Sequence, residues 1–169
     1  MTLLAAIVSL AQRWAHFYNY SSVAQIAVLF LHFGALLLAG GYAVAADRWV
    51  LRGGRLDAAP RALLLNELTA LHRPVVLGLV VLILTGTAMA LADAEALLRA
   101  PVFWLKMACF ALLLLNGVTL LRAHRKLQGV PRLDTRFAPE WRNLQWAARR
   151  SVSLWLLTLL LGTLLGTMS

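Results

Sequence analysis

The sequence is poor in cysteine and in acidic residues, and both shortages narrow the possible functions. A single cysteine, Cys109, stands inside an apolar stretch, which excludes a disulfide framework and a thiol-rich metal motif. Only seven of the 169 residues are acidic, and the chain has no nucleotide-binding motif, no paired carboxylates and no cluster of metal ligands. The apolar start at residues 3–10 lacks a basic segment before it and a small-residue cleavage site after it, so we expect it to remain in the mature chain.

Apolar residues, by contrast, make up 61% of the chain, which is too many for an ordinary water-soluble domain. A bilayer core about 30 Å thick requires a helix of roughly 20 apolar residues. Pro74 and Pro101 stand where the first turn of such a helix tolerates proline. We therefore predict one all-α membrane domain over residues 1–169, an integral four-helix bundle. Its spans are expected at residues 23–46, 74–92, 102–121 and 152–168.

Positive charge is distributed unevenly between the connections of these spans. Residues 47–73 carry five arginines and residues 122–150 carry seven arginines and Lys126, which leaves three of the 16 basic residues elsewhere. Cytoplasmic connections of membrane proteins are enriched in Lys and Arg. We therefore predict a multi-pass protein of the bacterial cytoplasmic (inner) membrane, with both long connections in the cytoplasm and both termini on the outer side. Since topology accounts for the basic residues and no recognition motif accompanies them, nucleic acid is excluded as a partner.

Three further segments have the amphipathic pattern of helices that lie at a membrane surface. In residues 3–17 apolar side chains recur at helical spacing opposite a polar stripe, so we expect a helix on the outer surface. In the first connection Pro60 begins a run whose leucines at 64, 68 and 71 share a face. In the second, Trp141, Leu144 and Ala148 share a face. We expect these two helices to cover the inner mouths of the bundle.

Small residues recur where membrane helices approach closely. Ala35, Ala39 and Ala43 form such a stripe in the first span, and Gly162 with Gly166 forms a GxxxG pair in the fourth. Packing within the bundle explains both. The glycine pair is also a candidate contact with a larger membrane complex or with a second copy of the chain.

His32 is the most informative single residue, because it lies about nine residues, or about 14 Å, inside the first span. It is a candidate ligand of haem iron or a proton carrier. The simpler interpretation is a neutral imidazole hydrogen-bonded to a neighbouring helix. Lys106 lies about one turn inside the third span from the same side, where it either extends its ammonium group to water or forms a polar site with His32. For Thr85, Thr87 and Asn116 we expect interhelical hydrogen bonds, or a place in the lining of a cavity.

His72 and His124 fall at the cytoplasmic ends of two spans, next to arginines. Two histidines from neighbouring helices are able to clamp a haem iron, with the arginines near the propionates. The simpler interpretation is a basic cluster that binds anionic lipid.

Three short strings resemble a known group of proteins: LHFG at 31–34, LTG at 84–86 and FWLK at 103–106, with Asn116-Gly117 further along the third span. The resemblance is to small bacterial four-helix membrane proteins that include copper-resistance D-type domains and HemJ-type protoporphyrinogen oxidases. The HemJ-type branch implies a b-type haem, a functional histidine in the first span and a lysine in the third, which correspond to His32 and Lys106. The copper-resistance branch implies metal movement, but the chain has no Met-rich or His-rich outer loop.

Three functions follow from these observations. The first is a haem-b membrane protein with His32 as an axial ligand of the metal and a quinone or a porphyrin as redox partner. The second is a cofactor-free accessory subunit of a larger membrane complex. The third is transport of a metal or small solute, for which four spans would have to oligomerise.

Overall fold

The computed structural model describes residues 3–53, 58–128 and 139–168, and these form helices without any strand. Four of the six helices are long and apolar enough to cross a membrane, namely α2, α3, α5 and α6. The prediction of an all-α four-helix bundle is therefore confirmed. The helices are α1 (Leu3–Tyr20), α2 (Ser22–Gly53), α3 (Ala58–Ala92), α4 (Ala94–Arg99), α5 (Pro101–Gln128) and α6 (Pro139–Met168).

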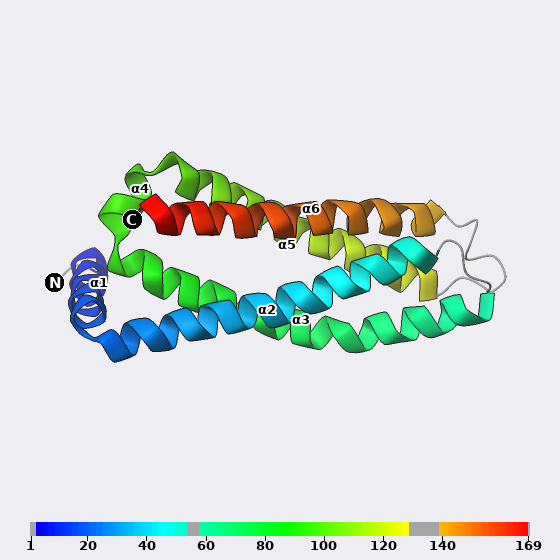
Figure 1. Cartoon of the computed structure of the whole chain (residues 1–169), viewed down its shortest axis with the longest axis horizontal. Helices are drawn as coiled ribbons and strands as arrows, with labels where there is room; N and C mark the ends of the chain where they lie inside the picture. The colour runs from blue at the N-terminus through cyan, green and yellow to red at the C-terminus, as the bar shows by residue number, and fades with distance from the viewer. Residues whose placement is uncertain (1–2, 54–57, 129–138, 169) are drawn as a thin grey trace.

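The bundle consists of two antiparallel hairpins, α2 with α3 and α5 with α6 (Figure 1). The hairpins pack on each other mainly through α2 and α6, and α3 meets α5 at one end, where Thr69 and His124 lie 3.4 Å apart. Both termini lie at the end that carries α1 and α4 (Figure 1). Following the predicted topology, we call this end the outer end and the opposite, arginine-rich end the inner end.

Helix α1 lies across the outer end of the bundle rather than along it (Figure 1). The Trp14 Nε1–H donates a hydrogen bond to the Ala88 carbonyl at 2.7 Å, and the Asn19 Nδ2–H donates to the Ala92 carbonyl at 3.3 Å. Ser21 separates α1 from α2, and its hydroxyl oxygen accepts a hydrogen bond from the Ala24 backbone N–H at 3.2 Å. The amphipathic segment at 3–17 is thus a helix, three residues longer than expected and fixed to the end of α3.

The expected helix start at Pro74 is wrong, because α3 continues through this proline. An interior proline removes one backbone hydrogen bond, a cost that packing against neighbouring helices offsets in membrane proteins. The stripe that faces the bundle runs unbroken on both sides of Pro74, at helical spacing. It consists of Leu65, Leu68, Leu71, Val75, Leu79 and Leu82. By contrast, Pro101 does begin α5, as predicted.

The expectation of separate interfacial helices at the inner end is also wrong. Trp141, Leu144 and Ala148 belong to α6, which is continuous with the fourth span, and α2 extends past Asp47 to Gly53. The side chains of residues 58–64, which include Pro60 and Leu64, lie outside the described part of the chain. Packing explains the difference, since the apolar faces of these helix ends bury one another and need no membrane surface.

The core of the bundle consists of two clusters. The inner cluster joins the inner ends of all four long helices and contains Val50, Leu65, Ala123, Leu127, Trp141, Leu144 and Ala148. The middle cluster contains Ala35, Ala39, Leu82, Leu113 and Trp155. Ala39 is fully buried because Gly78 brings α3 so close to α2 that a Cβ at position 78 would stand 2.6 Å from the Ala39 Cβ. The small-residue stripe predicted for the first span is therefore used for packing within the bundle.

Candidate functional site

His32 is joined to α3 by a hydrogen bond that fixes its tautomer. The distance from His32 Nδ1 to Thr85 Oγ1 is 2.8 Å. The Thr85 hydroxyl donates its own hydrogen to the Val81 carbonyl at 2.7 Å, so its oxygen is left to accept from His32. We therefore assign the imidazole hydrogen to Nδ1, which leaves the Nε2 lone pair available. This is the arrangement in which a histidine binds a metal through one nitrogen while a neighbouring group orients it through the other.

Two glycines make room for the candidate site residues of the outer half, His32 and Lys106. A Cβ at Gly86 would lie 3.4 Å from His32 Cε1, and a Cβ at Gly162 would lie 3.3 Å from Lys106 Nζ. His32 and Lys106 are both half-buried and lie within electrostatic range of each other. The structure thus brings together the two residues that the sequence singled out. It also shows that Gly162 of the predicted GxxxG pair lies against Lys106 inside the chain, which leaves less of this pair for an external contact.

In the outer half around His32 and Lys106 the buried residues come mainly from α3 and α6, and they include Thr85, Thr158 and Leu161. Helix α2 has no fully buried residue between Ser22 and Gly34, and α5 has none before Cys109. The two hairpins diverge towards this end of the bundle (Figure 1).

The inner half holds a different set of polar groups around a small cavity of about 130 Å³. Asp47 of α2 lines this cavity with only 3% of its surface exposed, and it is hydrogen-bonded to the side chain of Ser151 on α6. Its Oδ2 atom has no hydrogen-bond partner among the residues that the structure describes. A buried carboxyl group in this situation either carries a proton or accepts a hydrogen bond from a bound molecule, because an unpaired charge at this depth is costly.

His72 and His124 line the same cavity, from α3 and α5. His72 is exposed, whereas His124 is half-buried and its Nε2 atom lies 3.4 Å from the Thr69 hydroxyl. The ring of His124 also forms a hydrogen bond with the backbone at Leu65. Sequence reasoning thus placed these two histidines near each other correctly, but it did not anticipate that α3 engages the His124 ring.

Asp47 is the site residue that sequence reasoning missed, because the sequence interpretation assigned it to a connection. The available signal was its position at helical spacing behind Ala39 and Ala43 on one face of α2. The other intramembrane polar groups behave largely as expected. Asn116 donates a hydrogen bond to the Ala147 carbonyl at 2.8 Å and so links α5 to α6. Thr85 forms an interhelical bond, whereas Thr87 is exposed.

No group of three or more His, Cys, Asp or Glu side chains forms a metal site in residues 3–53, 58–128 and 139–168. The chain matches no protein-family model, no curated protein and no solved structure.

Proposed function

We propose that this chain is a multi-pass protein of the bacterial cytoplasmic membrane that binds b-type haem through His32. The observation that carries the proposal is the hydrogen-bond arrangement at His32. The His32 Nδ1–H donates to the Thr85 hydroxyl oxygen, and the His32 Nε2 atom keeps its lone pair for a ligand bond. His32 belongs to a helix long and apolar enough to span the membrane. The arginine-rich inner end faces the cytoplasm, since basic residues concentrate on that side of membrane proteins.

The residues of the outer half fit a haem better than those of the inner half. Lys106 supplies a cation for a propionate carboxylate, and Gly86 lets the His32 ring pack against α3. In the inner half the cavity of about 130 Å³ falls below the range of about 300–1,000 Å³ that is usual for small-molecule sites. His124 is moreover engaged by Thr69 and Leu65. We therefore assign the haem to His32 and not to the pair His72 and His124.

A bound haem supplies one-electron chemistry, which in a membrane points to a quinone or a porphyrin as the redox partner. The contribution of the chain is to orient the ligand and to keep water away from it. Thr85 holds the imidazole in one tautomer, and the apolar helices surround the site with a medium of low polarity. Both properties tune the affinity and the reduction potential of the iron.

The proposal is tested by titrating haem into detergent-purified protein and following the absorption spectrum of the bound form. We expect the unmodified protein to bind haem with a b-type spectrum, and His32→Ala to reduce the affinity by at least about tenfold, because an axial ligand is lost. His16→Ala is the matched control, since His16 is an exposed histidine of α1 that stacks on Tyr20.

Two results would overturn the proposal. One is equal haem affinity of His32→Ala and the unmodified protein, which would make the binding non-specific or place it at another residue. The other is the absence of binding by the unmodified protein. That second result would favour the cofactor-free accessory subunit.

A further inference from the structure

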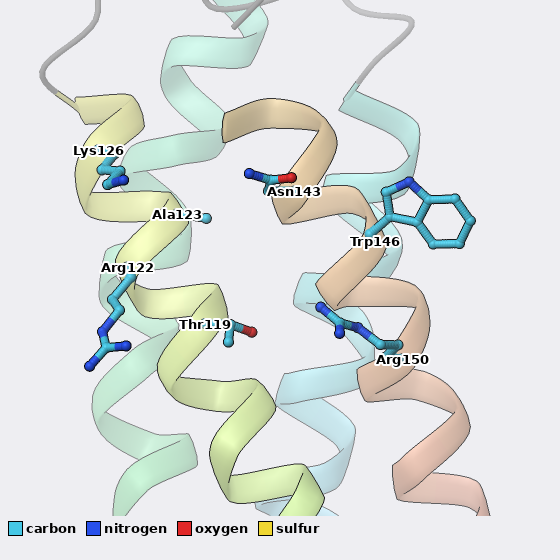
Figure 2. Close-up of a pocket in the computed structure, with 7 residues that line it drawn as sticks. All are labelled: Thr119, Arg122, Ala123, Lys126, Asn143, Trp146 and Arg150. Carbon is cyan, nitrogen blue, oxygen red and sulfur yellow. The ribbon is translucent and has the colours of Figure 1, made fainter. Parts of the chain in front are cut away.

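Helices α5 and α6 form a groove near the inner end, on the face of this hairpin that points away from the rest of the bundle (Figure 2). The groove has a volume of about 590 Å³. Polar side chains line it from both helices. Arg122, Lys126 and Thr119 belong to α5, and Asn143, Trp146 and Arg150 belong to α6. Figure 2 shows that Asn143 and Arg150 extend from α6 towards α5, whereas Arg122 and Trp146 flank the groove on opposite sides. The groove is distinct from the cavity at Asp47, which lies inside the bundle.

Among the described side chains, the charge of the groove is positive. Its lining contains three cations and no acidic side chain. Within the described part of the chain the only ion pair is Arg99 with Glu95, at the other end of the molecule, so none of the three groove cations is neutralised there. Three exposed cations on two neighbouring helices repel one another, and a bound anion removes that repulsion.

The walls of the groove are held in place by packing on the side that faces the bundle. Ala147 and Ala148 are almost completely buried, and Ala123 is 8% exposed, so α5 and α6 approach closely behind the groove. The hydrogen bond from Asn116 to the Ala147 carbonyl fixes their register next to Thr119. The cations are therefore presented on a rigid pair of helices.

Below the groove, towards the middle of the span, the same face of the hairpin is apolar. Leu115 and Leu112 lie one and two turns from Thr119 on α5, and Leu157 lies two turns from Arg150 on α6. All three leucines are exposed, at 64%, 54% and 40%. Trp146 is exposed too, and tryptophan concentrates at the level of lipid headgroups. The face thus combines a cationic site at headgroup level with an apolar surface along the acyl chains.

We propose that this groove binds the phosphate headgroup of an anionic phospholipid. Arg122, Lys126 and Arg150 neutralise the phosphate, and Thr119 and Asn143 provide hydrogen-bond donors beside them. The exposed leucines contact the acyl chains of the same lipid. A free phosphate ion would use the same cations but would gain nothing from the apolar face, so the lipid is the occupant that both parts of the surface fit.

The test measures binding of phosphatidylglycerol to the detergent-purified protein by native mass spectrometry, beside phosphatidylcholine with the same acyl chains and inorganic phosphate alone. We expect phosphatidylglycerol to bind more tightly than the other two. Replacing Arg122 and Arg150 together by Gln is expected to weaken its binding about 25-fold, at about fivefold for each cation. Neither residue belongs to the buried core, so both helices are expected to fold in this variant.

The matched control is the double variant Arg125→Gln with Arg142→Gln, which removes the same charge from the same two helices outside the groove. It should bind phosphatidylglycerol as the unmodified protein does. An equal loss in both double variants would show that only the general positive charge attracts the lipid, and this would overturn the proposal. The proposal would also fail if phosphatidylcholine bound as tightly as phosphatidylglycerol, or if inorganic phosphate bound as tightly as the lipid.

Discussion

The two halves of the bundle differ in the surroundings of their polar residues. In the inner half, a cluster of buried apolar residues closes the bundle, and the polar groups beside it are held in a small cavity. In the outer half the helices carry few buried residues, and His32 keeps one ring nitrogen open. The comparison teaches that burial alone does not identify a binding site. Asp47 is the more deeply buried residue, but our proposal assigns the bound group to His32.

The largest difference between the halves is expected in stability. Leu144→Ala removes a side chain that is 2% exposed within the inner cluster, and it should lower the free energy of unfolding by about 2–5 kcal/mol. Leu38→Ala removes a side chain that is 61% exposed towards lipid and should change it by less than about 0.5 kcal/mol. Reversible unfolding in mixed detergent micelles measures both. Similar losses in the two variants would show that the inner cluster is not the main core.

The contact between α2 and α3 allows a second stability test, at a position where we expect a larger side chain to be destabilising. Gly78→Ala places a methyl group against the Ala39 Cβ and the Ala35 backbone, so we expect a loss of about 1–3 kcal/mol in the same unfolding measurement. Gly41→Ala is the matched control on α2, where nothing lies within 4 Å of the added Cβ. It should be neutral or stabilise the helix by up to about 1 kcal/mol. A neutral Gly78→Ala would mean that the two helices are farther apart than described.

In the outer half, the hydrogen bond from His32 to Thr85 is expected to matter for haem affinity. Thr85→Val keeps the shape of the side chain but removes the acceptor for Nδ1–H, which should weaken haem binding about 10–100-fold. Thr87→Val makes the same chemical change two residues further along α3, where the side chain is exposed, and should leave haem affinity unchanged. Spectrophotometric titration of both variants measures the effect. Equal affinities would remove the assigned role of Thr85.

The smallest expected effect concerns the buried carboxyl group of the inner half. Asp47→Asn keeps the size of the side chain and a hydrogen bond with Ser151, but it removes a group that is costly to ionise inside the bundle. We expect unfolding in detergent at neutral pH to require about 1 kcal/mol more free energy. A marked loss of stability would instead show that the Asp47 carboxylate has a partner in the membrane.

The existence of the four spans was predictable from the sequence, because length and hydropathy determine it. The residues at which the helices begin and end were not predictable in the same way. A proline normally begins or ends a helix, and Pro101 follows this rule, whereas Pro74 does not. The continuous leucine stripe on both sides of Pro74 was present in the sequence, but its effect depends on α2, which lies against it in the fold. Local patterns thus predict the elements, while contacts between helices decide where they end.

The candidate site was predictable in the outer half for a similar reason. An ionisable residue inside an apolar span is visible from the sequence alone, which is how His32 and Lys106 were found. Asp47 lies near the end of its span among arginines, where a charged residue carries no such signal. Its burial depends on Ser151, which is more than 100 residues further along the chain. The spacing of Ala39, Ala43 and Asp47 places Asp47 on the buried face of α2, but no pattern within one segment identifies Ser151 as its partner.

The measurement that tests the central claim most directly is the reduced and oxidised absorption spectrum of two variants purified from haem-supplied bacteria. One is His32→Ala and the other is the double variant His72→Ala with His124→Ala. Our account predicts that the b-type spectrum is lost in His32→Ala and retained in the double variant, because the haem site lies in the outer half. A spectrum that persists in His32→Ala and disappears in the double variant would contradict it and place the haem in the inner half.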